Sequence, residues 1–266
     1  MTQIAAYLNK EFLDTGDAFG MAKSLGFDAV EIPEMFFSPP EDEKGQEQLA
    51  QTIKKYDLKA RWHTSPSYNQ YFSSADADLR SQNIERMFWE LSLAHKMGWN
   101  VFLIHPGHAG AEEDKQRVYE ALRLINEKAI ALNIQLLLEN ASGPFDGDPH
   151  QLVRTIEEVP GLKLTFDCSH AYHSIFCREG KVTLIDHLSI VKPFVYSFQF
   201  NDYDGKTNCE VGKGMLPWRQ FMPMALDIGC GTWAIELNTI DETVASRDFL
   251  QRWLEKDGKR ARGQEG

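Results

Sequence analysis

The sequence predicts an α/β protein that folds as a single-domain (β/α)8 TIM barrel. Eight short apolar runs, rich in Val, Ile, Leu and Phe, alternate with longer amphipathic segments along the 266 residues. The runs lack strict polar alternation, as is typical of parallel strands buried on both faces. Eight strand-then-helix units in about 250 residues have the size and order of this barrel.

The strands are expected in the order of the apolar runs. They cover Gln3–Tyr7, Ala29–Ile32, Ala60–His63, Asn100–Ile104, Gln135–Leu138, Leu162–Phe166, Phe194–Phe200 and Thr232–Leu237. Helices are expected between them where apolar residues recur at a spacing of three to four. These segments are Gln46–Tyr56, Leu79–Met97, Lys115–Ala131 and Phe249–Glu255.

Glycine and proline mark several ends of these elements. Gly26, Gly98 and Gly161 stand just before expected strands. At such positions the turn that ends the preceding helix requires a positive φ. The pair Asp148-Pro149 suits a helix N-cap followed by proline at the first helical position.

The barrel is expected to occupy residues 1–255 as one domain, followed by a polar tail over 256–266. No break in composition divides the chain, and the proline-rich stretch at 37–40 is expected to be a loop. An open doubly wound sheet is the alternative. Its first strand is usually followed by a glycine-rich phosphate loop, and the stretch Tyr7-Leu8-Asn9-Lys10 contains no glycine.

Composition and charge exclude several classes of partner. With 28 Lys+Arg against 39 Asp+Glu, the formal net charge is −11, which disfavours binding to nucleic acid or to an anionic membrane. No apolar run reaches the roughly 18–20 residues that cross a bilayer. The first residues lack the basic and apolar regions of a secretory signal, so a cytoplasmic location is expected. A homo-oligomer remains possible.

Polar groups end seven consecutive expected strands. In TIM barrels the catalytic groups stand at the carboxyl ends of the strands, which converge on one mouth of the barrel. These side chains are therefore expected to meet in space. In chain order they are Glu31, His63, His105, Glu139, Asp167, Gln199 and Glu236.

The carboxylates of this set predict a bound divalent cation. Unpaired carboxylates at such close quarters repel one another and are costly to bury, and a cation removes that cost. Glu139, Asp167 and Glu236 offer oxygen ligands together with the amide of Gln199. Four oxygen ligands suit Mg²⁺, Mn²⁺ or a borderline Zn²⁺. One ion is expected, with Mn, Mg, Co and Zn all open.

The histidines divide into two groups. His63 and His105 stand at the ends of expected strands, so they are predicted either to orient substrate or to hold a second ion, which would favour zinc. Glu31 is a weaker candidate, because it belongs to a weaker apolar run. Four other histidines do not lie at strand ends and are expected at the surface, namely His108, His150, His173 and His187.

The ordered motifs resemble those of the xylose isomerase-like TIM-barrel superfamily. They are Leu138-Glu139-Asn140, Phe166-Asp167-Cys168-Ser169-His170, Phe198-Gln199-Phe200-Asn201-Asp202 and Ile235-Glu236-Leu237. Members of this superfamily include sugar-phosphate isomerases, ketose 3-epimerases, hydroxypyruvate isomerase, inosose-processing enzymes and endonuclease IV. The similarity extends in order and spacing over nearly the whole chain.

The resemblance implies roles for individual residues. It implies metal ligands at Glu139, Asp167, Gln199 and Glu236, with proton transfer by Glu139 and Glu236. Many members carry His on strand 7, whereas Gln199 is similar to the hydroxypyruvate isomerase branch. The Asp-x-x-His motif of the epimerases places its histidine against the substrate, which implies that role for His170.

These observations predict a metal-dependent isomerase or epimerase of carbohydrate metabolism. Its substrate would be a small sugar or hydroxy-carbonyl compound, converted through a metal-stabilised enediolate. Lys206 and, similarly, Lys213 are weak candidates for contact with a substrate phosphate or carboxylate. The pocket wall is expected to include Trp62, Tyr68, Phe145 and Trp218.

Other functions of the same barrel stay open. One is an endonuclease IV-like zinc phosphodiesterase or hydrolase, whose strand-3 and strand-4 histidines match His63 and His105. That enzyme also needs a strand-7 histidine, which Gln199 replaces, and a following Asp-x-His, of which Lys206–Gly214 keeps only a Gly-x-Gly end. A metal-dependent lyase and a non-catalytic sugar-binding protein are further alternatives.

Overall fold

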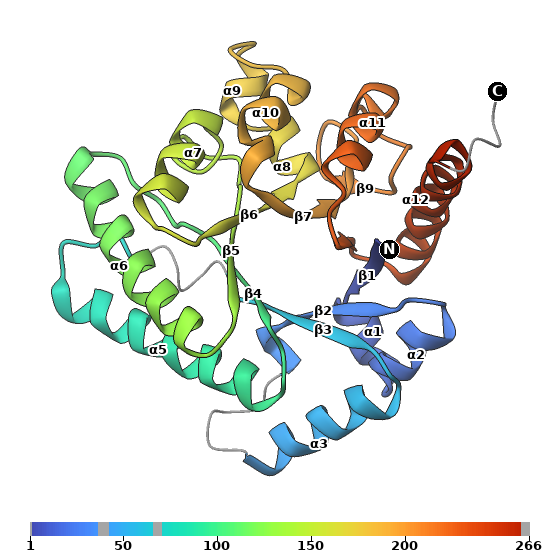
Figure 1. Cartoon of the computed structure of the whole chain (residues 1–266), viewed down its shortest axis with the longest axis horizontal. Coiled ribbons are helices and arrows are strands. Elements are labelled where there is room, and N and C mark those ends of the chain that lie inside the picture. The colour runs from blue at the N-terminus through green and yellow to red at the C-terminus, as the bar shows by residue number, and fades with distance from the viewer. Residues whose placement is uncertain (1, 37–42, 66–70, 262–266) are drawn as a thin grey trace.

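Eight parallel strands close into a barrel in the order β1-β10-β7-β6-β5-β4-β3-β2, as the sequence predicts. The computed structural model describes residues 2–36, 43–65 and 71–261. Figure 1 shows helices surrounding the ring of strands. The barrel strands are β1 (Gln3–Tyr7), β2 (Ala29–Pro33), β3 (Lys59–His63), β4 (Val101–Ile104), β5 (Gln135–Glu139), β6 (Lys163–Asp167), β7 (Val195–Phe200) and β10 (Thr232–Ile235).

The four predicted helices are present, and shorter elements accompany them. The α-helices are α1 (Lys10–Asp14), α2 (Ala18–Ser24), α3 (Glu43–Lys55), α5 (Ala77–Lys96), α6 (Glu112–Ala131), α7 (Pro149–Glu158), α8 (Cys168–Tyr172), α9 (Ile175–Arg178), α10 (Leu184–Val191), α11 (Trp218–Ile228) and α12 (Ile240–Ala261). Single 3₁₀ turns form η1 (Glu34–Phe36) and η2 (Lys192–Phe194), and β8 (Asp202–Tyr203) pairs antiparallel with β9 (Asn208–Cys209).

The predicted boundaries agree with the backbone. Gly26, Gly98 and Gly161 have φ of 84°, 77° and 94°, so each ends its turn in the left-handed region. Asp148 caps α7 by accepting from the backbone N–H of His150, with Pro149 as the first helical residue.

The last helix is longer than the sequence pattern indicates. It begins at Ile240 rather than at residue 249 and continues to Ala261, into the expected tail. Thr239 and Glu242 explain the start, because the Thr239 hydroxyl accepts from the Glu242 N–H at 3.2 Å and donates to the Glu242 carboxylate at 2.8 Å. The end of the tail and the proline-rich loop at 37–40 lie outside the described residues.

Side chains alternate along each strand between the helices and the barrel interior. Outward residues such as Trp62, Phe102 and Phe198 pack in the main core beneath the helices. Three inward alanines, Ala5, Ala29 and Ala234, form a separate small cluster. Two residues further along the chain are Tyr7 on β1, Glu31 on β2 and Glu236 directly after β10, so the strand period of two brings these polar groups to the same interior.

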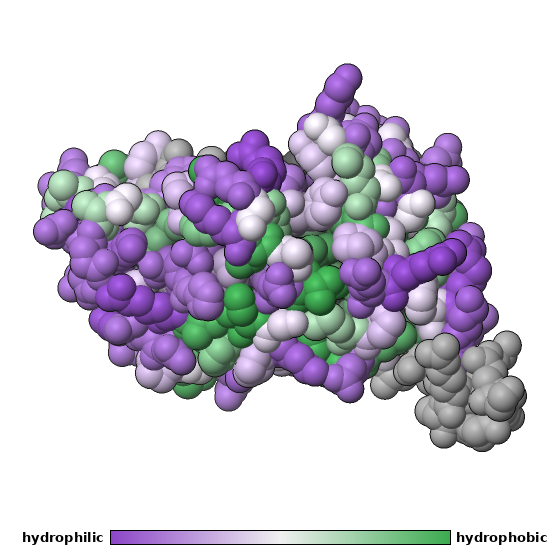
Figure 2. All heavy atoms as spheres, turned by 90° about the horizontal axis from the view of Figure 1, so that it is seen from above, coloured by the Kyte–Doolittle hydropathy of each residue, from purple (hydrophilic) through white to green (hydrophobic). Residues whose placement is uncertain are grey.

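The outer surface is mostly polar. Figure 2 shows a largely hydrophilic face in which apolar residues gather near the middle. Among the described residues, no helix combines the length and the apolar composition needed to span a membrane.

Candidate active site

Four of the polar groups at the strand ends, His63, His105, Glu139 and Glu236, line one small cavity. Its volume is about 320 Å³, at the lower end of the range for small-molecule sites. The lining comes from the ends of β1, β2, β3, β4 and β5, from α8 and from the residue that follows β10. It consists of Tyr7, Pro33, Glu34, His63, Thr64, Ser65, His105, Glu139, His170 and Glu236.

Glu31 occupies the centre of a buried hydrogen-bond network. Its Oε1 accepts from His63 Nδ1 at 2.7 Å and from Gln199 Nε2 at 2.9 Å. Its Oε2 forms an ion pair with the guanidinium of Arg61. Gln199 Nε2 also donates to Glu236 Oε2 at 2.7 Å, so the network joins β2, β3 and β7 to the residue after β10.

The two strand-end histidines converge on Glu139. His63 Nε2 lies 3.1 Å from His105 Nε2 and 3.4 Å from Glu139 Oε2. One ligand atom from each of these three residues lies within 4.8 Å of the others. A second such group combines Glu31, His63 and Glu236.

Three hydrogen-bond donors orient the Asp167 side chain at the start of α8. Its Oδ1 accepts from the His170 N–H at 2.7 Å and from Ser169 Oγ at 3.1 Å, while Oδ2 accepts from Asn201 Nδ2 at 3.0 Å. This N-cap begins α8 at the strand end and brings His170 over the cavity. Asp167, His170 and Glu139 form a third group with ligand atoms within 4.8 Å.

Burial and mutual repulsion shape the protonation of the cluster. Burial raises the pKa of Glu139 well above its usual range, and nearby carboxylates add to the effect. Burial and the neighbouring carboxylates also raise the pKa of Glu236 to about 7. Although burial opposes it, the surrounding carboxylates raise the pKa of His63 to about 10. Burial and the His63 cation lower the pKa of His105, so the pair divides into one cation and one neutral ring.

The donor set fits a divalent cation. Within the part of the chain that the structure describes, Glu139 Oε2 and Gln199 Oε1 are buried oxygens that accept no hydrogen bond. Buried polar atoms are normally satisfied, so oxygens that accept no hydrogen bond beside further carboxylates are suitable ligands for a cation. Oxygens of this kind, with imidazole nitrogens close by, suit Mg²⁺, Mn²⁺ or Zn²⁺.

The structure brings together all seven predicted strand-end residues and His170. The two predicted lysines are elsewhere. Lys206 is exposed in the turn between β8 and β9, where its N–H donates to Asp204 Oδ1 at 2.7 Å. Lys213 is also exposed, and neither lysine lines the cavity.

Two ionisable lining residues are absent from the sequence-based set. Tyr7 ends β1, contacts the His63 ring edge-on with centroids 5.5 Å apart, and has a pKa raised by burial and by nearby carboxylates. Tyr7 is the polar residue that ends the first strand, so the rule that selected the seven predicted strand-end residues applies to it as well. Glu34 lies in η1 beyond β2, where no strand pattern marks it.

Three of the four residues expected in the pocket wall do not line the cavity. Trp62, Phe145 and Trp218 are buried in the main core rather than in the pocket wall, and Tyr68 lies outside the described residues. Trp62 points outward because it alternates with the inward residues Arg61 and His63.

Two of the four histidines expected at the surface are not there. His187 is fully buried, because it shares a helical stripe with Leu184, Leu188 and Val191 on α10. His173 is half-buried and stacks on Tyr203 with ring centroids 4.8 Å apart. His108 and His150 are exposed, as expected.

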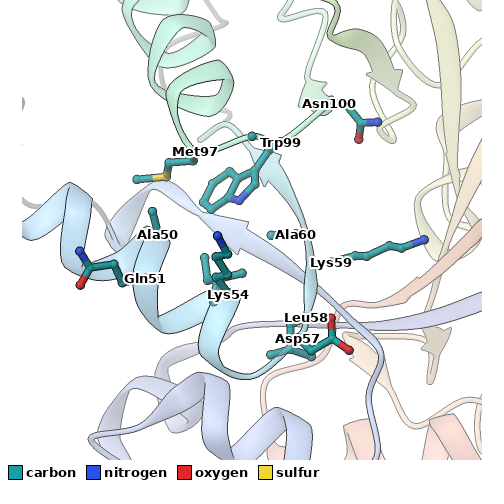
Figure 3. Close-up of a pocket in the computed structure, with 12 residues that line it drawn as sticks. Ala50, Gln51, Lys54, Asp57, Leu58, Lys59, Ala60, Met97, Trp99 and Asn100 are labelled. Carbon is teal, nitrogen blue, oxygen red and sulfur yellow. The ribbon is translucent and has the colours of Figure 1, made fainter.

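A second cavity of about 550 Å³ lies at the opposite ends of β3 and β4. Figure 3 shows residues of α3, including Lys54, together with Trp99 and with Lys59 at the start of β3. The two lysine side chains point in different directions (Figure 3). This cavity therefore lacks the convergence of titratable groups seen at the carboxyl ends.

The chain belongs to the xylose isomerase-like TIM barrel family, whose model matches residues 19–255. Among curated proteins, the uncharacterised MJ0008 of Methanocaldococcus jannaschii is 24% identical over 152 residues. That match covers 57% of this chain and 64% of MJ0008, which is less than two thirds of its length.

Solved structures share the same fold over nearly the whole chain. A D-tagatose 3-epimerase-like protein has a TM-score of 0.81 at 18% identity, covering 98% of this chain and all of that one. The TTHB071 protein of Thermus thermophilus, in a structure obtained by soaking with ZnCl₂, has a TM-score of 0.74 at 22% identity. It covers 96% of this chain and 99% of its own.

Proposed function

We propose that the protein is a metal-dependent sugar isomerase or epimerase acting on a small hydroxy-carbonyl substrate. The observation that carries this proposal is a pair of glutamates, the buried Glu139 and the half-buried Glu236, which line one small cavity and have raised pKa values. Membership of the family and the similarity to a D-tagatose 3-epimerase-like protein support the substrate class.

One divalent ion would be held by Glu139, Asp167, Gln199 and Glu236. Asp167 is oriented by its three hydrogen-bond donors and has a ligand atom within 4.8 Å of one from Glu139, while Gln199 donates a hydrogen bond to Glu236. When bound, the ion supplies a Lewis acid that makes the hydrogen beside a chelated carbonyl group more acidic. The similarity to a protein solved after soaking with ZnCl₂ supports a metal, and its identity stays open.

Glu139 and Glu236 are proposed as the acid–base pair. A general base works best when its pKa lies near the working pH, and the pKa of Glu236 is raised to about 7. One glutamate takes the proton from the substrate carbon and the other returns one. Return to the opposite face of the same carbon gives an epimer, whereas return to the neighbouring carbon gives an isomer.

The remaining cavity residues would bind the substrate. His170 faces the cavity from α8, and its Nδ1 is a buried atom without a hydrogen-bond partner among the described residues. His63, held as a cation by the carboxylates around it, can donate to a substrate oxygen, while neutral His105 can donate or accept. The volume of about 320 Å³ suits a small polar molecule.

A zinc phosphodiesterase is the second candidate. The convergence of His63, His105 and Glu139 favours it, because imidazole and carboxylate ligands in one group suit Zn²⁺. The net charge of −11 argues against a DNA substrate, since phosphate contacts dominate binding to DNA.

Metal content and product analysis test the proposal together. Protein purified without chelator and reloaded with mixed Mn²⁺, Mg²⁺, Co²⁺ and Zn²⁺ is expected to hold about one ion per chain, which Glu236→Gln should lose. Glu34→Gln, in the same cavity but outside the ligand set, is the matched control and should keep the ion. The loaded protein should interconvert ketoses or their isomers.

Two results would contradict the isomerase proposal. Two or more tightly held zinc ions with nicking of an abasic-site duplex would favour the phosphodiesterase. A protein that holds no ion would require another role for the four oxygen ligands.

A further inference from the structure

The side-chain amide of Gln199 is fixed in one of its two orientations. Its Nε2 donates to Glu31 Oε1 at 2.9 Å and to Glu236 Oε2 at 2.7 Å, which uses both of its N–H groups. A carboxylate only accepts hydrogen bonds, so these two partners select the nitrogen end of the amide. Gln199 Oε1 then faces away from both and has no hydrogen-bond partner in the described part of the chain.

Both oxygens of Glu31 already contact protein groups, although Oε2 accepts no hydrogen bond in the part of the chain that the structure describes. Its Oε1 already accepts from Gln199 and from His63, and its Oε2 is paired with Arg61. Glu31 is fully buried and does not line the cavity. Arg61 is also buried, and it reaches Glu31 because the two are register partners on β2 and β3 with inward side chains.

We propose that Glu31, anchored by Arg61, is a positioning residue that turns the amide oxygen of Gln199 toward the cation. This inference rests on the proposed function in one respect, because it requires a divalent ion at the strand-end cluster. It assigns to the β2 glutamate a role distinct from ligation. The competing role is direct ligation with His63 and Glu236, whose ligand atoms also lie close to one another.

The substitution Glu31→Gln tests the orientation directly. The Arg61 guanidinium would draw the oxygen of the new amide, so its nitrogen would face Gln199. Gln199 could then turn its own oxygen toward that nitrogen and present N–H groups to the cation instead. Removing such an orienting partner typically costs 10–100-fold in metal affinity.

A double-mutant cycle separates positioning from ligation. The dissociation constant for Mn²⁺ alone is measured by calorimetry for the wild type, Glu31→Gln, Gln199→Ala and the double variant. Positioning predicts that Glu31→Gln weakens binding about 10–100-fold when Gln199 is present and less than about threefold when it is Ala. An equal loss in both backgrounds would overturn the proposal, because Glu31 would then act without Gln199.

Circular dichroism and thermal melting of each metal-free variant check the fold. If Glu31→Gln does not fold, Glu31→Met/Arg61→Met replaces it in the same cycle, since exchanging a buried ion pair for apolar side chains leaves no charge unpaired. Weakened Mn²⁺ binding that depends on Gln199 is again the supporting result.

The outcomes distinguish this inference from the proposed function. If the effects of Glu31 and Gln199 on Mn²⁺ binding are coupled but the protein converts no sugar, only the proposed function is contradicted. If the protein converts a sugar but the two effects are additive in the double-mutant cycle, only the positioning role is contradicted. A wild-type protein that does not bind Mn²⁺ would overturn both.

Discussion

Buried ionisable residues in this protein differ in how many of their polar atoms have hydrogen-bond or ion-pair partners. Burial raises the pKa of Glu31, but Arg61, His63 and Gln199 outweigh that effect and hold the pKa at about 2. Glu139 retains an unbonded oxygen and a raised pKa. Glu31 is ion-paired with Arg61 and accepts two hydrogen bonds through Oε1, which favours a structural role, whereas Glu139 is the candidate for chemistry.

The burial of His187 predicts a loss of stability in acid. Burial lowers its pKa to about 3 in the folded chain, against 6.5 for an ordinary histidine. Between these values the unfolded chain binds a proton at this position and the folded chain does not. The free energy of unfolding should therefore fall by about 1.4 kcal/mol for each pH unit below 6.5 on account of this group.

Urea unfolding from pH 7 to pH 4 measures this effect. His187→Leu should show a shallower decline than the wild type, because the leucine does not titrate. His95→Leu, at an exposed position and not among the groups that shift the pKa of His187, is the matched control and should follow the wild-type slope. Equal slopes in all three proteins would mean that His187 is not buried as a neutral ring.

Most of the candidate site follows from one rule about single residues. The strand period of two, applied where each apolar run ends, selected seven residues that share one interior, four of which line the cavity. The same rule would have added Tyr7. Glu34 and Arg61 could not be identified in this way, since one lies in a 3₁₀ turn and the other depends on the partner opposite it.

At the scale of elements, the strands were predictable and the short helices were not. Strands buried on both faces give continuous apolar runs, so all eight barrel strands lie where those runs occur. The helices α8 and α9 span five and four residues, too few for a helical period to appear in the sequence. The β8–β9 hairpin is similarly short, and its turn carries Lys206 away from the cavity.

The glycine turn between α5 and β4 supplies a test at this scale. Gly98 has φ of +77° and an added Cβ would meet no atom within 4 Å, so Gly98→Ala should destabilise the fold only through backbone strain. That cost is about 1–2 kcal/mol in the free energy of unfolding. Gly231→Ala is the matched control, because the space there is equally open and no positive φ is required.

Chemical denaturation of Gly98→Ala and Gly231→Ala measures the free energy of unfolding of each variant. The control should be neutral or slightly stabilising, since alanine restricts the unfolded chain. Equal destabilisation at the two positions would show that the left-handed turn is not what Gly98 provides.

For the whole molecule, the proposed metal site predicts that the acidic cluster lowers stability when no ion is bound. In chelator, Glu236→Gln should be at least as stable as the wild type, because it removes one of the repelling carboxylates. With saturating Mn²⁺ the order should reverse, since only the wild type gains the binding free energy. At 100 times the dissociation constant that gain is about 2.7 kcal/mol.

Thermal melting with and without Mn²⁺ measures the reversal. A gain of this size should raise the wild-type melting temperature by about 5–10 °C in a chain of this length. A similar rise in Glu236→Gln would mean that the ion binds elsewhere.

Proton transfer at carbon is the central claim, and solvent deuterium incorporation tests it most directly. The Mn²⁺-loaded protein is incubated with a panel of ketoses in deuterium oxide, and the carbon beside the carbonyl is followed by NMR. We predict that the wild type incorporates deuterium there and that Glu139→Gln loses at least about 100-fold of the exchange rate while keeping its fold. Product formed without deuterium, or undiminished exchange in Glu139→Gln, would contradict the assignment of Glu139 as a proton-transfer residue.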